Sequence, residues 1–253
     1  MDGSNKSKPP KQLWLWAGLG LLFMITSVCT GIVAFLVIKK HVIGSKLSSG
    51  SAITAIDLRP YYDQTEAWDR PGEWEAPPHG HHVLGGVPFE ANGLLRLIGN
   101  GAQKDKRTYR EKVEGIVVGR KFERLYLLHA ASYPARDETP YASVVLHYAD
   151  GSTWFDLLYG RHARDWWRPK NEAVSAVSDP DSKVVWRGDG NFKPNWTRRL
   201  YKTTFANPRP HEKVATVDVV SQHARPNAVI IAMSVGPATL PAPEDDPPSL
   251  PEP

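Results

Sequence analysis

The stretch SVVLHYADGSTWFDLLY, residues 143–159, decides the fold class of this chain because it predicts a β-hairpin by itself. On either side of Asp150-Gly151 the side chains alternate between two faces, which is the period of a β-strand. Asp-Gly tolerates the positive φ angles that a tight hairpin requires, so we expect the turn at these two residues. Apolar side chains occur on both faces of the predicted hairpin, and we therefore expect it to lie centrally in the fold.

Short apolar runs separated by turn residues continue this pattern over residues 53–236. No run has a 3.6-residue period that is long enough for a major helix. The predicted strands cover residues 53–58, 94–98, 115–118, 122–129, 143–149, 153–159, 183–187, 199–205, 214–220 and 228–235. Many short strands are typical of a sandwich or a barrel, and the sequence thus predicts an all-β, jelly-roll-type β-sandwich over residues 53–236.

A long apolar segment precedes the predicted sandwich. Residues 13–38 carry no charged side chain, and at about 1.5 Å of helical rise per residue they exceed the roughly 30 Å of a bilayer's hydrocarbon. Trp14 and Trp16 at its start are residue types that favour the membrane interface. A cleaved signal peptide is the alternative, but its apolar part is usually only about 7–15 residues long. We expect an uncleaved, single-pass transmembrane helix over residues 12–40.

The remaining segments complete the predicted organisation. Residues 1–11 are polar and basic and are expected to form a short cytoplasmic tail, and residues 41–52 a flexible spacer. Residues 237–253 are rich in proline and acidic, without basic or aromatic residues, which predicts a disordered tail. Lysines flank the apolar segment on both sides, so the positive-inside rule barely discriminates between the two orientations of the helix in the membrane. We place the C-terminal domain outside the cytoplasm.

Charge and cysteine content limit the expected partners and cofactors. The net charge is +4, with both signs mixed along the sequence and no basic cluster among aromatics, so nucleic-acid binding is not expected. Cys29 is the single cysteine, so the predicted sandwich has no disulfide. His79, His81 and His82 are possible zinc or copper ligands, but their segment resembles a loop without Cys or carboxylate at ligand spacing. We therefore expect neither a metal nor another cofactor.

The densest polar and aromatic cluster, YGRHARDWW, residues 159–167, directly follows the predicted hairpin. In a loop at the end of the sandwich, its tryptophans could stack on a sugar ring while charged groups bind the hydroxyls. The candidate ligand-binding residues are Arg161, His162, Arg164, Asp165, Trp166 and Trp167. In the alternative interpretation Trp166 and Trp167 cap the core, and Arg164 pairs with Asp165 or another nearby carboxylate.

Signals for catalysis are weak. The sequence contains no G-x-S-x-G elbow, H-E-x-x-H motif or phosphate-binding loop, and the predicted sandwich has no cysteine nucleophile. His129 and His147 fall on predicted strands, where a hydrogen-bonded structural histidine is the usual explanation. No spacing pairs two carboxylates as a glycosidase requires.

Motifs along the whole predicted sandwich carry a resemblance to known domains. In chain order they are Ile56-Asp57-Leu58, Gly86-Val87-Pro88-Phe89-Glu90, Gly93-Leu94-Leu95-Arg96-Leu97, Ile116-Val117-Val118-Gly119-Arg120-Lys121, Leu125-Tyr126-Leu127-Leu128-His129-Ala130, residues 145–151 and residues 159–167. This order resembles the jelly-roll domains of bacterial membrane-anchored proteins, particularly the planctomycete and verrucomicrobial kind. Those domains are similar to galactose-binding-like and NPCBM-type β-sandwiches, and in related chains they accompany FecR-like or sigma-factor-associated modules. The resemblance implies an extracytoplasmic binding or sensing module and carries no catalytic residues.

We therefore expect a single-pass protein of the bacterial cell membrane whose periplasmic domain binds carbohydrate or another envelope component without catalysis. The first alternative is a protein–protein interaction subunit of an envelope complex, which should show a larger, flat apolar patch. The second alternative is a glycoside hydrolase-like enzyme, which needs a cleft with two carboxylates. The sequence leaves the ligand and the oligomeric state open.

Overall fold

The computed structural model describes residues 52–63, 75–169, 177–189 and 195–239. The predicted cytoplasmic tail (1–11), transmembrane helix (12–40) and nearly all of the predicted spacer lie outside these residues, as does most of the predicted C-terminal tail. Within the described part of the chain, no helix has the length and apolar character needed to cross a membrane.

The described residues are almost entirely β-strands. A 3-10 turn, η1 (Arg59–Tyr61), and a short helix, α2 (Asn100–Lys104), interrupt them. The strands are β1 (Thr54–Ile56), β2 (Gly80–Leu84), β3 (Val87–Ala91), β4 (Leu95–Arg96), β5 (Lys112–Arg120), β6 (Arg124–Ser132), β7 (Pro140–Tyr148), β8 (Gly151–Leu158), β9 (Trp167–Pro169), β10 (Ser182–Asp189), β11 (Trp196–Ala206), β12 (Val214–Ser221) and β13 (Asn227–Gly236).

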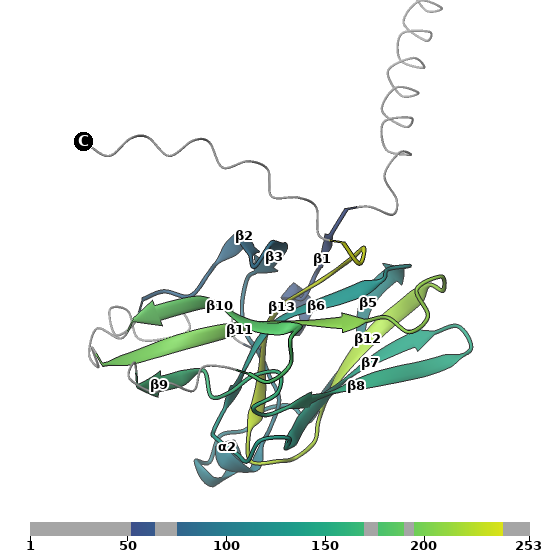
Figure 1. The fold of residues 1–253 in the computed structure, drawn as a ribbon. Coiled ribbons are helices and arrows are strands. Elements are labelled where there is room, and N and C mark those ends of the chain that lie inside the picture. Colours follow the sequence, from purple (N-terminus) through teal and green to yellow (C-terminus); the bar gives the residue numbers. More distant parts are fainter. Residues whose placement is uncertain (1–51, 64–74, 170–176, 190–194, 240–253) are drawn as a thin grey trace, which may run out of the picture. The chain divides into compact units, whose positions relative to one another are not determined.

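Two antiparallel sheets form the body of the domain (Figure 1). The large sheet has the order β1-β13-β6-β11-β10, with β4 added beside β13 and β9 beside β11. The small sheet has the order β5-β12-β7-β8, and β2 pairs with β3 as a separate hairpin. Because the apolar faces of the two sheets share one buried core, the described part of the chain is an all-β sandwich of antiparallel sheets.

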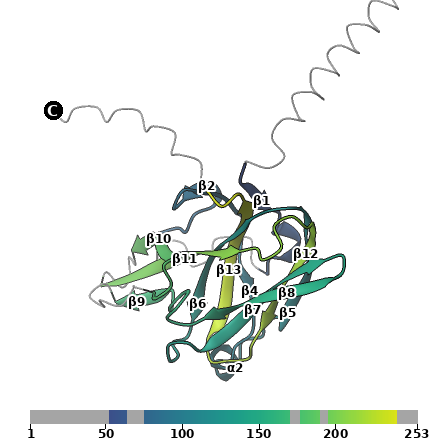
Figure 2. The same ribbon diagram turned by 45° about the vertical axis from the view of Figure 1, so that its right-hand side comes forward.

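The centre of the large sheet is buried on both faces. Every residue of β13 is buried, and in Figure 2 this strand runs through the middle of the domain. One face of β6 and β13, with Leu127 and Ile230, packs against the small sheet. The opposite face, with Leu128 and Ile231, packs against the β2–β3 hairpin. Burial on both sides explains why these strands have nearly continuous apolar sequences.

Each predicted strand corresponds to a strand of the structure, although the bounds differ. The strands β2, β3 and β9 were not predicted from the sequence. The expected loop around His79, His81 and His82 is wrong in part, because His81 and His82 lie in β2 and pair with Glu90 and Phe89 of β3. The His81 imidazole also lies 2.9 Å from the Glu90 carboxylate. No group of three or more His, Cys, Asp or Glu side chains suited to a metal ion occurs in the described ranges.

The predicted hairpin at residues 143–159 is confirmed as β7 and β8, with two differences. Tyr148 pairs with Gly151, so Ala149 and Asp150 form the turn, and the positive φ falls on Gly151 alone, at 153°. The expected central position is wrong for β8, which is an outer strand of the small sheet as described. Its apolar residues on one face pack inward, whereas Trp154 on the other face is 64% exposed.

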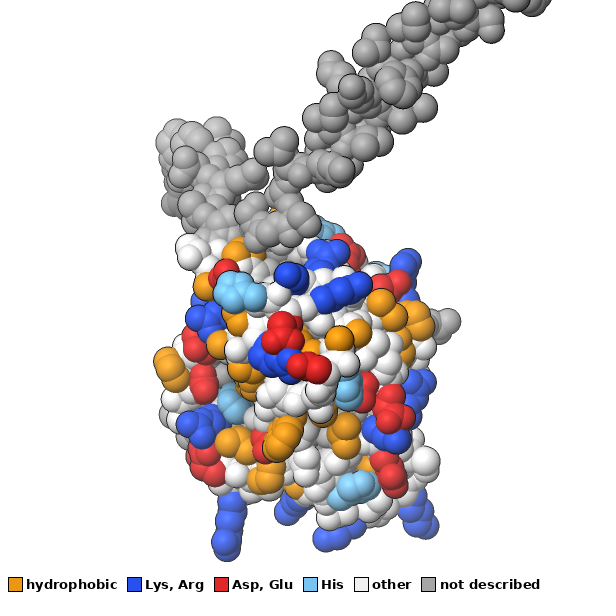
Figure 3. All heavy atoms as spheres, turned by 90° about the vertical axis from the view of Figure 1, so that its right-hand side faces the viewer, with side chains coloured by type: hydrophobic (Ala, Val, Ile, Leu, Met, Phe, Trp, Pro, Cys, Tyr) orange, Lys and Arg blue, Asp and Glu red, His pale blue; other side chains and the backbone are white. Residues whose placement is uncertain are grey.

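Charged side chains of both signs are interspersed over one face of the domain. Figure 3 shows the right-hand side of the domain in Figure 1, where basic, acidic and hydrophobic side chains alternate over short distances. On this face of the domain no charge of one sign dominates.

Because β6 is buried on both faces, shortening one of its side chains should destabilise the domain. Leu127→Ala should lower the unfolding free energy by about 2–5 kcal/mol because the side chain is fully buried between the sheets. Val117→Ala should change it by less than about 0.5 kcal/mol, since Val117 is 68% exposed. Urea unfolding followed by circular dichroism measures both values, and equal effects would contradict the described core.

Candidate binding cleft

The predicted site segment, residues 159–167, follows β8 and enters the large sheet. The backbone N–H of Trp166 donates to the carbonyl of Ala131 at 2.8 Å, and that of Arg199 donates to the carbonyl of Trp166 at 2.7 Å. These bonds hold residue 166 between the end of β6 and the beginning of β11. Because residue 166 is held there, the six candidate residues fall into two groups with different surroundings.

Arg164 belongs to the first group and is held by an ion pair. Its guanidinium donates two hydrogen bonds to the Asp137 carboxylate, at 2.9 and 2.8 Å. The pair packs over Gly160, whose φ is +77° and where an added Cβ would lie 2.3 Å from an Asp137 oxygen. A glycine is therefore required at residue 160 both for the turn and for the approach of Asp137. Arg164 thus pairs with a nearby carboxylate, that of Asp137.

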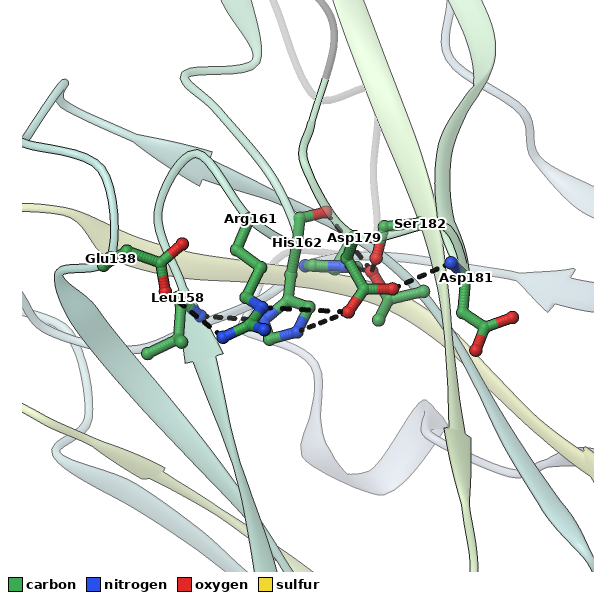
Figure 4. A network of polar contacts seen from close by, with 9 residues as sticks. Glu138, Leu158, Arg161, His162, Asp179, Asp181 and Ser182 are labelled. Carbon is green, nitrogen blue, oxygen red and sulfur yellow. Dashed lines mark hydrogen bonds and ion pairs between the residues drawn. The ribbon is translucent and has the colours of Figure 1, made fainter.

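His162 and Arg161 form a second polar network, shown in Figure 4. The His162 Nδ1 accepts a hydrogen bond from the Leu158 backbone N–H at 2.9 Å, and its Nε2 lies 3.6 Å from an Asp179 oxygen. Arg161 reaches Glu138 at 3.3 Å and Asp179 at 3.9 Å. His162 is buried, and burial lowers its pKa although Asp179 acts in the opposite direction. This network joins the loop to the chain before β10.

A buried histidine on β6 continues the same network into the core. Thr203 donates to the carbonyl of His162 at 3.2 Å, so the His129 Nε2 at 2.8 Å acts as the donor to the Thr203 hydroxyl. The Tyr141 hydroxyl then donates to the His129 Nδ1 at 3.2 Å. Both ring nitrogens are satisfied in the neutral form, and burial lowers the pKa of His129 to about 3. His129 is therefore a structural residue, as its position on a strand predicted.

The second group of candidate residues lines a cleft of about 520 Å³. The cleft lies on the face of the large sheet that the β2–β3 hairpin covers elsewhere, at the end where β6 finishes and β13 begins. This end is opposite to Thr54 of β1, which pairs with Val235 near the end of β13. The lining residues are Leu94, Arg96, Asp105, Arg107, Ser132, Tyr133, Pro134, Asp165, Trp166, Trp167, Trp196 and Arg198.

Aromatic side chains are prominent in the wall of this cleft. The rings of Trp167 and Trp196 meet edge to face, with centroids 5.5 Å apart. The guanidinium of Arg198 lies 5.0 Å from the centroid of the Trp166 ring. Burial lowers the pKa of Arg198 to about 10, so the side chain is still protonated at neutral pH. The indole rings provide apolar faces for a ligand, whereas Arg198 is buried beside them.

The polar lining residues carry both charges and are held by neighbouring side chains. The Tyr133 hydroxyl donates to the Asp105 carboxylate at 2.5 Å, and burial together with this bond raises the pKa of Tyr133 to about 12. The Asp165 carboxylate accepts the Trp167 backbone N–H at 3.3 Å. Arg96 donates to Asp63 at 3.0 Å. Such pre-set polar groups favour binding, because few side chains need to be ordered when a ligand arrives.

The structure therefore brings together only half of the candidate residues, Asp165, Trp166 and Trp167, in one cleft. The rest of the lining was not predicted from the sequence. It comes from the neighbourhood of β4, the region after α2, the end of β6 and the start of β11. Aromatic and charged residues such as Tyr133 and Trp196 lie near predicted strands, which is a hint from residue type alone. No common motif or spacing links these residues in the sequence.

Comparison with known proteins does not assign the chain to a family. No protein-family model matches the chain, and no curated protein matches its sequence. The likeness to galactose-binding-like and NPCBM-type domains stays a prediction.

The two buried histidines predict acid destabilisation of the fold. Burial lowers the pKa of both from 6.5, so below that pH the unfolded chain takes up protons that the folded protein does not bind. This stability is fully present above about pH 6.5 and is lost as the pH falls toward the folded-state pKa, about 3 for His129. For His129 the unfolding free energy should fall by about 1.4 kcal/mol per pH unit below pH 6.

Urea titrations at several values between pH 7 and pH 4 measure this slope. His129→Gln should make the slope shallower, whereas His211→Gln, at an exposed position, should leave it unchanged. An NMR titration of wild-type protein gives the same information if the His129 variant does not fold. Protonation of His129 near pH 6.5 in the folded protein would contradict its buried, neutral state.

Proposed function

We propose that this protein is a non-catalytic carbohydrate-binding module held at a bacterial cell membrane by residues 12–40. The observation that carries the proposal is the cleft between Trp166, Trp167, Trp196 and Tyr133. Its volume of about 520 Å³ falls within the range of small-molecule sites, roughly 300–1,000 Å³. It combines aromatic rings with arginine and aspartate side chains, which suits a ligand having apolar C–H faces and hydroxyls at its rim.

The cleft lies at the end of the large sheet where β6 finishes and β13 begins, opposite to the end where β1 pairs with Val235. The proposed jelly-roll-type fold and the resemblance to galactose-binding-like domains point to the same class, a module in the periplasm that binds a glycan of the envelope.

Replacing Trp166 tests the cleft directly, with Trp186 as a matched control. Both tryptophans are half-buried against the same apolar cluster, but only Trp166 lines the cleft. On a glycan array and in calorimetry with the best glycan, Trp166→Ala should weaken binding about tenfold or more because a stacking face is lost. Trp186→Ala should lose similar stability and retain the affinity. Full-length protein in a detergent without a sugar head group keeps the array free of competing ligand.

The outcomes separate the alternatives. Equal affinity in wild type and Trp166→Ala would contradict the cleft as the glycan site. Absence of binding to every envelope glycan would favour the protein-interaction alternative, which crosslinking in native membranes then tests. A hydrolase remains the second alternative because Asp105 and Asp165 both line the cleft. The binding proposal expects no release of reducing ends from a bound glycan, whereas release that is lost in Asp105→Asn or Asp165→Asn would identify an enzyme.

The proposed anchor gives a separate expectation. Full-length protein should stay in the membrane fraction after a carbonate wash at alkaline pH, because an apolar helix inserts stably into the bilayer. Protein from residue 51 onward should be released. Protease added to intact spheroplasts should digest the C-terminal domain if it is periplasmic. Recovery of full-length protein in the soluble fraction would contradict the anchor.

A further inference from the structure

The outer face of the small sheet contains a second hollow, which the proposed function does not use. It has a volume of about 420 Å³ and lies on the face that points away from the sandwich core. Its lining residues come from β7, β8, β12 and the residues just after β12. They are Ser143, Val145, Trp154, Asp156, Val220 and Gln222.

Trp154 is the main apolar side chain of this hollow. It pairs across the sheet with Val145, and it is 64% exposed although tryptophan is normally well covered. A cross-strand contact between Trp154 and Val145 would stabilise the sheet. This contact does not explain why most of the indole surface is exposed to water. The exposed indole therefore offers a flat apolar surface to a ligand.

A chain of hydrogen bonds orients the polar groups beside Trp154. The Gln222 amide donates to the Ser143 hydroxyl at 2.5 Å, and that hydroxyl donates to the Asp156 carboxylate at 2.5 Å. Ser143 is buried, so it holds both partners in place. A carboxylate accepts up to about four hydrogen bonds and an amide makes up to about four, so Asp156 and Gln222 keep capacity for a ligand.

The charge of the lining residues and the apolar area of the hollow indicate which class of ligand it can bind. Among the described residues that line the hollow, the single charged side chain is Asp156, which disfavours an anionic ligand. The apolar part consists of Val145, Trp154 and Val220. A stable protein interface buries about 800 Å² on each partner, which three side chains among polar neighbours do not supply. An aromatic face beside a fixed carboxylate and amide instead fits a ring with apolar C–H groups and hydroxyls.

We propose that the hollow on the small sheet is a binding site for a neutral sugar ring of a glycan chain. The ring stacks on Trp154, and its hydroxyls bind Asp156 and Gln222. The site shares no residue with the cleft around Trp166, so it can be tested whether or not that cleft binds a glycan.

Calorimetry on the full-length protein, in a detergent without a sugar head group, tests this site. The probes are cellotetraose, xylotetraose, mannotetraose and chitotetraose as neutral ligands, and tetragalacturonate as an anionic one. We expect binding of at least one neutral tetrasaccharide, weakened about tenfold or more in Trp154→Ala. Val117→Ala should keep the wild-type affinity, because Val117 is a similarly exposed apolar residue of the same sheet outside the hollow. Thermal unfolding checks that both variants are folded.

The same measurements in Trp166→Ala protein separate this site from the cleft. Binding that depends on Trp154 and persists in Trp166→Ala supports the second site even if the proposed cleft fails. Binding that is lost in Trp166→Ala and unchanged in Trp154→Ala overturns the second site and leaves the cleft intact. Binding of none of the neutral probes, a preference for tetragalacturonate, or a concentration-dependent dimer abolished by Trp154→Ala would each overturn the proposal.

Discussion

The other elements of the domain are arranged around β6 and β13, which are buried on both faces. These strands carry too much apolar surface for one layer to cover, so the small sheet packs on one face and the β2–β3 hairpin on the other. The hairpin does not extend to the end of β6. There the cover is completed by Trp166, and the remaining space becomes the cleft. The candidate site is thus a consequence of how the large sheet is covered.

The loop that follows β8 connects packing with the site. Its end, at Trp166, is hydrogen-bonded between β6 and β11, and its earlier part is tied to the body of the domain by Arg164 with Asp137 and by His162 near Asp179. The first three candidate residues therefore position the last three. Gly160 is part of the same arrangement, because only a residue without a Cβ lets Asp137 approach so closely.

The two hollows differ in chemistry because they form on different kinds of surface. The cleft lies over a sheet buried by several segments, and arginines from β4 and β11 reach it together with aspartates from loops. The hollow around Trp154 lies on the open face of the small sheet, where a regular register places Ser143 opposite Asp156 and Val145 opposite Trp154. The first surface is a partly open cleft that carries both charges, whereas the second is shallower and carries one carboxylate.

The all-β class, the approximate strands and the β7–β8 hairpin could be predicted from the sequence, because alternation and turn residues act over a few neighbouring positions. The sequence also placed Asp165 and Trp166 in a loop after β8, whereas Trp167, expected in the same loop, begins β9. The outer position of β8 in its sheet, and the cleft that Tyr133 and Trp196 line together with Trp166, became apparent in the tertiary structure. Strand order and a shared lining depend on pairing between distant segments, and a local period carries no information about which strands become neighbours.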